Sequence, residues 1–275
     1  MLISGCPPGA RGKFSPPNLV EKTTAYHRDL LPRITYIVDP STPYPTVISD
    51  SMMSIAGVRR IEHERMGERV YRELRELLIA GQVAPGDRMS LRGLAVQFGT
   101  SAMPVREAVF RLLAEQAVQM LPNRTIIVPV MTRARFQELR RIRLSLEGLA
   151  TEIAAGLITA AALEDAAHHN KLFVSAEDGP SIVRANKDFH FTIYRAARMP
   201  MLMQMIEGLW TQAGPVINFD IRSGSPRITD RVARRHHLGA IDALARRDAR
   251  AACQAIMADI DEAGDYILTS GRLSA

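Results

Sequence analysis

Four polar side chains in the second half of the chain have the types and spacing of a metal site. Asn186 and His190 are four residues apart, so in a helix both side chains lie on one face. His237 precedes Asp248 by eleven residues, and Asp259 follows it by eleven. If Asp248 is the corner of an antiparallel helical hairpin, His237 and Asp259 each lie about 16 Å from it, at a similar height. Two imidazoles, a carboxylate and an amide in one place predict a site for a divalent first-row metal.

Other chemically active side chains in this half have weaker patterns. Arg143 and Glu147 are four residues apart, the spacing of a surface ion pair on one helix. The methionines within 199–205 and Trp210 are expected to pack in the core or to line a pocket. His168, His169 and His236 are expected to face solvent.

A second stretch, GTSAMPVREAVFRLL at 99–113, has the pattern of a recognition helix. Gly99 marks a turn, Ser101 is expected to cap a helix, and Pro104 lies in its first turn. In a helix-turn-helix, the N-terminal end of the second helix meets base edges in the major groove. Arg106, one turn into the helix, is long enough to reach guanine N7 and O6 or a phosphate oxygen.

The surrounding elements predict a winged helix-turn-helix domain over residues 54–131. Val70, Leu74 and Leu78 repeat at helical spacing, and glycines and a proline then break the helix over 80–90. A short helix over 91–99 precedes the recognition helix, which runs to about Gln116. The stretch AVQMLPNRTIIVPV that follows is typical of a β-hairpin, the wing.

The remainder, residues 132–275, is expected to be an antiparallel all-α bundle. No strand pattern of comparable strength occurs there, and amphipathic stretches follow one another with short breaks. The fold class is therefore mainly α. The expected helices are 133–157, 159–176, 181–197, 200–219, 231–247 and 248–268.

Residues 1–53 differ from the rest. Eight prolines interrupt any periodic pattern, which predicts a mostly disordered extension. The alternative interpretation is that translation starts at Met52, Met53 or Met66 and that the extension is not part of the natural protein.

Composition limits the class of protein. With 275 residues and 47% apolar residues, the chain can form two domains with cores. A net charge of +6 makes an anionic partner plausible. Cys6 and Cys253 form no disulfide framework or zinc motif. No apolar run approaches the roughly 20 residues that span a membrane, and the N-terminus lacks a signal-peptide pattern. We expect a cytoplasmic protein without membrane contact.

Residues 79–128 resemble the winged-helix domain of the GntR family of bacterial transcription regulators. The shared pattern comprises Pro85, Gly86, Leu94, Ala95, Gly99, Ser101, Pro104, Val105, Arg106, Glu107 and Ala108. The resemblance implies DNA binding through Arg92, Ser101 and Arg106, and through Arg124 at the wing tip. Ala102 and Met103 replace the family's usual Arg-Thr and occupy DNA-contacting positions, while Gln116 and Thr125 stand where glycine is favoured.

The second half resembles the FCD domain, the effector-binding bundle of the FadR-like branch of these regulators. Its cues are LRRIRLSLEGLATEIAA, NKDFHFTIYRAA and HLGAIDALARRDARAACQAIMADI. Members commonly bind a divalent metal through one Asp and three His. The Asp position falls on Asn186, two His positions fall on His190 and His237, and the last falls on Asp259. The resemblance implies zinc, nickel or manganese here and an effector anion bound by Arg143; a metal-free pocket with the same residues is the alternative.

Two functions from different classes compete at this stage. The first is a homodimeric regulator, with repression favoured, that binds an operator in double-stranded DNA and senses a small carboxylate or sugar acid. The second is a metalloenzyme with an accessory DNA-binding domain. The chain lacks the paired Glu-x-x-His motifs of di-iron bundles and any recognisable nucleophile with a partner, so a non-enzyme is expected.

Overall fold

The computed structural model describes residues 34–37, 46–49, 66–222, 232–271 and 273–274. The chain divides into two compact units, Met1–Glu62 and His63–Ala275. In the first unit, strand β1 (Ile34–Ile37) pairs antiparallel with β2 (Thr46–Ser49). The sequence analysis expected no regular structure before residue 54, and this pair, rich in β-branched residues that favour extended backbone, differs from that expectation. The rest of that range lies outside the described residues.

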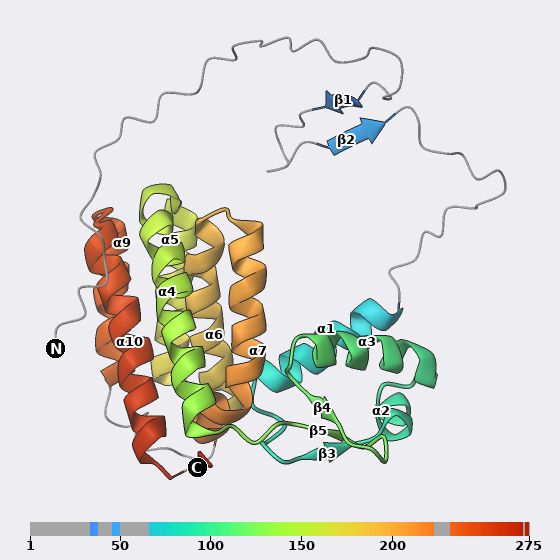
Figure 1. Cartoon of the computed structure of the whole chain (residues 1–275). Helices are drawn as coiled ribbons and strands as arrows, with labels where there is room; N and C mark the ends of the chain where they lie inside the picture. The colour runs from blue at the N-terminus through green and yellow to red at the C-terminus, as the bar shows by residue number, and fades with distance from the viewer. Residues whose placement is uncertain (1–33, 38–45, 50–65, 223–231, 272, 275) are drawn as a thin grey trace. The chain divides into compact units, whose positions relative to one another are not determined.

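A winged helix-turn-helix begins the second unit, as the sequence predicts (Figure 1). Its elements are α1 (Met66–Ile79), β3 (Arg88–Met89), α2 (Leu91–Gln97), α3 (Ala102–Ala114), β4 (Gln119–Met120) and β5 (Ile126–Ile127). The strands form an antiparallel sheet in the order β3-β5-β4. The sequence predicted the β4–β5 wing but not β3, because two residues are too few to establish an alternating pattern.

The apolar faces of α1 and α3 form the core of this domain. Val105, Val109 and Leu112 on α3 are buried in one cluster with residues of α1 and the wing. Helical spacing puts these side chains on one side of α3, so packing holds that side inward. The opposite side of α3 is therefore available to DNA.

Helix α3 begins directly after Ser101, but the Ser101 hydroxyl does not cap it. The serine has the extended backbone of an N-cap residue, yet its side chain accepts no hydrogen bond from the helix. N-cap side chains normally accept from the second or third N–H of the helix, and the third residue here is Pro104, which has no N–H. The predicted cap is wrong, and the hydroxyl stays exposed at the helix tip.

Two residues beside the wing have left-handed backbone. Gln116 has φ of 56° and Arg124 has φ of 62°. Glycine adopts this conformation without steric cost, which accounts for the glycine that the resembling family favours at Gln116. Here the Gln116 side chain makes a contact that glycine could not, because its Oε1 accepts a hydrogen bond from Arg135 Nη2 at 3.0 Å. Thr125 is not left-handed; Arg124 takes that conformation instead.

Among the described residues, the remainder of the second unit forms a bundle of six helices, and the sequence predicted each of these six (Figure 1). Helices α4 and α10 pack against each other, as do α5 and α6, and α9 and α10. The helices are α4 (Arg133–Leu157), α5 (Ala160–Ser175), α6 (Gly179–Ala196), α7 (Pro200–Arg222), α9 (Val232–Ala245) and α10 (Ala249–Thr269).

The corner between α9 and α10 lies where the sequence predicts it. Arg247 turns the chain with φ of 56°, and the Asp248 carboxylate then accepts from the Ala251 N–H at 3.0 Å. This cap fixes the start of α10, so the equal spacing of His237 and Asp259 from the corner becomes equal height in the hairpin.

The chain between the two domains pairs with a residue near the C-terminus. The Ser274 N–H donates to the Met131 carbonyl at 3.1 Å, and the Arg133 N–H donates to the Ser274 carbonyl at 3.0 Å. The segment that joins the winged helix to α4 is thus held on both sides of Thr132.

No helix within the part of the chain described here is long and apolar enough to cross a membrane.

Candidate DNA interface and metal site

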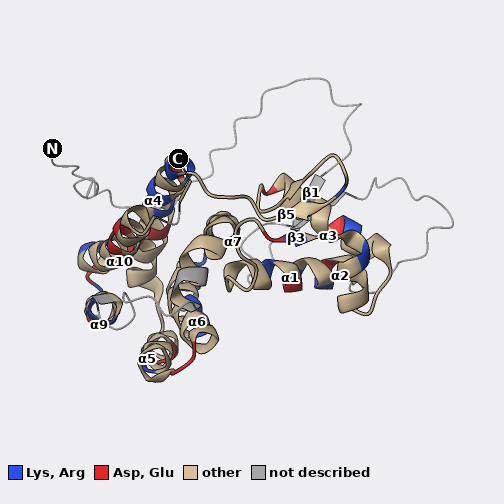
Figure 2. Cartoon of the chain, turned by 90° about the horizontal axis from the view of Figure 1, so that it is seen from below, with Lys and Arg blue, Asp and Glu red and all other residues tan. Residues whose placement is uncertain are grey.

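All six side chains assigned to DNA contact are exposed. They are Arg92, Ser101, Ala102, Met103, Arg106 and Arg124. The first lies at the start of α2, the next four open α3, and the last lies in the turn of the wing. Arg106 has no ion pair with any residue that the structure describes. Lys and Arg also occur throughout the bundle (Figure 2), so net charge alone does not identify this face.

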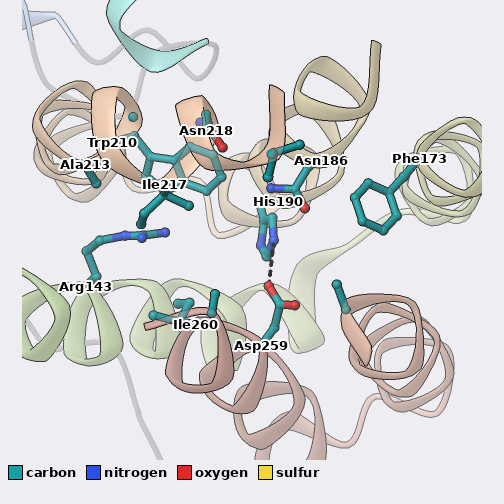
Figure 3. Close-up of a pocket in the computed structure, with 14 residues that line it drawn as sticks. Arg143, Phe173, Asn186, His190, Trp210, Ala213, Ile217, Asn218, Asp259 and Ile260 are labelled. Carbon is teal, nitrogen blue, oxygen red and sulfur yellow. Dashed lines mark ion pairs between the residues drawn. The ribbon is translucent and has the colours of Figure 1, made fainter. Parts of the chain in front are cut away.

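A cavity of about 40 Å³ lies in the bundle, and its lining comes from six helices, α4, α5, α6, α7, α9 and α10. Figure 3 shows His190 and Asn186 of α6 opposite Asp259 of α10, with Arg143 of α4 and Trp210 of α7 beside them. A single water needs about 10–15 Å³ by this measure, so the cavity holds roughly three water-sized groups.

A buried hydrogen-bond chain fixes the protonation of His190. The Tyr194 hydroxyl donates to Glu147 Oε2 at 2.6 Å, and burial raises the Tyr194 pKa well above its usual value, so the proton stays on the phenol. The Tyr194 oxygen must then accept from His190 Nδ1, 3.0 Å away. In the neutral ring the lone pair of His190 is therefore on Nε2, which lies 3.2 Å from Asp259 Oδ2.

His237 is held in the same tautomer by a different partner. Its Nδ1 lies 3.1 Å from Asn170 Oδ1, and a carbonyl oxygen only accepts, so Nδ1 carries the proton. The ring stacks on Phe189 with centroids 4.0 Å apart. Its Nε2 is fully buried and has no hydrogen-bond partner among the described residues. Burial lowers the His237 pKa to about 3, so the ring is neutral at physiological pH.

These two nitrogens meet Asp259 in one place. One ligand atom each from His190, His237 and Asp259 lie within 4.8 Å of one another, and His237 Nε2 is 3.9 Å from Asp259 Oδ2. Metal–nitrogen and metal–oxygen bonds of about 2.1 Å put neighbouring ligand atoms about 3.0–3.4 Å apart. The three groups thus fit a metal ion with small adjustments. Asn186 lies beside His190 in the cavity wall, one helical turn earlier.

Arg143 and Glu147 form the expected ion pair, but it is buried rather than on the surface. Arg143 Nε lies 2.6 Å from Glu147 Oε1, and the Glu147 side chain has no exposed area. The same carboxylate also accepts from Tyr194 and from Trp210 Nε1, at 3.1 Å. Sequence reasoning missed this network, because only the fold brings α4, α6 and α7 together around Glu147.

Two lesser expectations need correction. Met201 and Met205 of α7 and Met199 just before it are exposed, whereas Met203 packs against the core and Trp210 lines the cavity, as predicted. His236 is not free in solvent, because its ring pairs with Glu262 of α10.

The buried His237 makes the metal-free protein sensitive to acid. Its pKa is depressed in the fold, so the unfolded chain binds the proton near pH 6.5 and the folded chain only near pH 3. This contribution to stability is complete above pH 6.5 and is lost as pH falls below it. Between pH 7 and pH 5 we expect a loss of about 2 kcal/mol.

Urea unfolding in the presence of a chelator at the two pH values measures this loss. His237→Gln removes the titrating ring and serves as the control, with a shallower pH dependence expected. An equal loss in parent and variant would show that other groups cause the acid sensitivity.

Comparison with known families identifies the class of protein. Residues 66–128 match the family described as "Bacterial regulatory proteins, gntR family", and residues 138–262 match the "FCD domain". The chain belongs to the GntR family of transcriptional regulators, with the FCD architecture of its FadR-like branch. It is a DNA-binding regulator of transcription.

Individual relatives agree with this assignment. The HTH-type transcriptional regulator McbR of Escherichia coli (strain K12) is 30% identical over 215 residues, covering 77% of this chain and 96% of McbR. A solved structure of E. coli McbR/YncC has a TM-score of 0.70 and 27% identity, and covers 74% of this chain and 97% of that one. The gluconate operon transcriptional repressor of Bacillus subtilis (strain 168) is 26% identical over 211 residues, 73% of this chain and 84% of the repressor. The matches give no support to the metalloenzyme alternative.

Proposed function

We propose that the bundle binds one divalent ion through Asn186, His190, His237 and Asp259, and that this ion receives the carboxylate of a small effector acid. The observation that carries the proposal is the orientation of two buried imidazoles. Tyr194 and Asn170, outside the ligand set, hold both Nδ1 protons, so that both Nε2 lone pairs converge on Asp259. Such outer partners are typical of metal-binding histidines.

The charges around the cavity favour binding of the effector anion by a metal ion over binding by the side chains alone. The Arg143 charge is already compensated by Glu147, and Asp259 adds a negative charge. An anion entering without a metal would meet this carboxylate with no net positive charge opposite it. A divalent ion would neutralise Asp259 and supply a Lewis acid for the effector carboxylate.

Zinc, nickel and manganese all suit this ligand set. Imidazole favours the first two, while carboxylate and amide oxygens suit manganese. Arg143 would bind the far end of the effector, since its Nε and Nη2 bond Glu147 and its Nη1 remains for an occupant. The named relative from B. subtilis regulates a gluconate operon, which supports a sugar acid as the effector class.

On the DNA side, we propose a cytoplasmic homodimer that represses transcription and has no enzymatic activity. One recognition helix reads only a short half-site, so two copies on a pseudo-palindromic operator supply the length that specificity needs. Repression is supported by the name of the B. subtilis relative.

The test of the metal site is the metal content of protein purified without an affinity tag. We expect about one divalent ion per chain, and calorimetric titration of the stripped protein should restore it with micromolar or tighter affinity. A turnover screen with sugar acids on the same sample should show no product. If no ion binds more tightly than millimolar, the metal site is wrong and a metal-free effector pocket replaces it.

Arg106→Ala should weaken binding to the selected operator. Loss of a bidentate contact to guanine costs about 1–3 kcal/mol, or roughly 5- to 150-fold in Kd. Titration by mobility shift measures the change, on a site selected from random DNA. Arg250→Ala is the matched control, because Arg250 is an exposed arginine of the bundle. Equal affinity of Arg106→Ala and parent would remove Arg106 from the DNA contacts.

Ala102 and Met103 should shift the base preference away from guanine at the pair that they face. Short apolar side chains contact a thymine methyl group but offer guanine no hydrogen bond. Selection from a random DNA pool tests this for the parent and for Ala102→Arg, which restores the family's usual residue. We expect guanine enrichment only in the variant; enrichment already in the parent would contradict the assignment.

A further inference from the structure

Helix α7 lies between the cavity and the DNA-binding domain, and one of its side chains contacts both. Asn218 lines the cavity, and its Nδ2 donates a hydrogen bond to the carbonyl oxygen of Ile79, the last residue of α1. The final carbonyls of a helix have no partner within it, so Asn218 satisfies a group that would otherwise be unpaired. The side chain is 2% exposed, so water does not compete for this bond.

One turn earlier on α7, Gly214 also lies between the cavity and the end of α1. Its backbone lines the cavity on one side and packs closely against α1 on the other. A Cβ atom at this position would lie 2.6 Å from the Ile79 Cα, closer than real Cβ atoms approach. Two positions four residues apart therefore contact the cavity on one side and the end of α1 on the other.

Helix α7 is also the wall best able to move. Pro215, between these two positions, has no N–H for the Thr211 carbonyl and so removes one helical hydrogen bond. The opposite walls are tied together, because Arg140 of α4 bonds both Asp261 and Asp265 of α10. The cavity holds roughly three water-sized groups, fewer than a sugar acid has. A sugar acid therefore fits only if a wall of the cavity moves, and α7 is displaced first.

We propose that Asn218 and Gly214 are positioning residues that transmit occupancy of the cavity to α1 and so to the winged helix. The inference deepens the proposed function, because it assigns the route between effector pocket and DNA-binding domain. The ion pairs of α1 with the bundle, Glu76 to Lys187 at 2.6 Å and Arg75 to Glu207 at 2.9 Å, are partly exposed and do not line this cavity. Pairs of that kind contribute little.

The test uses an occupant built into the chain. Ala263 of α10 lines the cavity, so Ala263→Phe fills it without any ligand. Hydrogen exchange of the Ala80, Gly81 and Gln82 amides, which close the end of α1, is the readout. We expect Ala263→Phe to change their exchange rates at least threefold, and the change to fall below 1.5-fold when Asn218→Ala is added. The control Lys187→Ala should leave the threefold change intact.

Two outcomes would overturn the inference. One is unchanged exchange at 80–82 in Ala263→Phe, and the other is an equal change with and without Asn218. If Ala263→Phe does not fold, Ala263→Leu provides a smaller occupant for the same comparison. Zinc titration of the parent is run alongside: failure to bind zinc contradicts the metal proposal but leaves the exchange result to decide the route through α7.

Discussion

Glu147→Leu is expected to destabilise the folded protein by about 3–5 kcal/mol, because it leaves a buried guanidinium without its counter-ion. Arg143 is 8% exposed, and its pKa is raised by the Glu147 carboxylate despite burial, so it stays charged in the fold. The Tyr194 and Trp210 donors would lose their shared acceptor as well. Urea unfolding of the metal-free protein at pH 7 measures the loss.

A paired replacement separates the ion pair from the packing. Arg143→Met with Glu147→Leu removes both charges, and a buried pair replaced by apolar residues of similar size is often neutral. The double variant should therefore be more stable than Glu147→Leu alone. If the single variant lies within 1 kcal/mol of the parent, Arg143 finds solvent or another partner and the buried network is not the structural centre of the bundle.

His190→Ala combined with His237→Ala should abolish metal binding and the stability that the metal adds. At a free metal concentration 100 times the Kd, binding to the folded state alone adds about 2.7 kcal/mol. That increment, measured as the difference in unfolding free energy with and without metal, should fall to zero in the double variant.

The increment isolates the metal from the packing lost with two buried rings, since both measurements use the same variant. His168→Ala is the control, because His168 is an exposed histidine on α5, and it should keep the full increment. A double variant that retains half of the increment would place the ion elsewhere in the chain.

The sequence predicted the helices well because each has an apolar face and a clear start. Thr132 and Asp248 accept hydrogen bonds from the first turns of α4 and α10, and both were recognisable as breaks in the pattern. The convergence of His237 and Asp259 followed from equal spacing about one corner. Such arguments are local, or depend on a single hairpin.

Side-chain networks that span several helices could not be predicted from the sequence. Nothing in the spacing of Glu147, Tyr194 and Trp210 shows that they share hydrogen bonds, because three helices must first pack together. Asn170 and Asn218 were missed for the same reason, since each is an ordinary polar residue on an amphipathic helix until its partner is known. The failed Ser101 cap differs, because Pro104 three residues later was a visible warning.

The pairing of Ser274 with Met131 and Arg133 bears on how this regulator is handled at the bench. A purification tag or reporter domain fused at the C-terminus would pull on the segment that joins the two domains. Movement of the fused domain would disturb the segment between the winged helix and α4, and with it the orientation of the recognition helix. A reporter assay built on such a fusion would measure the fusion as much as the effector, so the N-terminal end is the better place for a label.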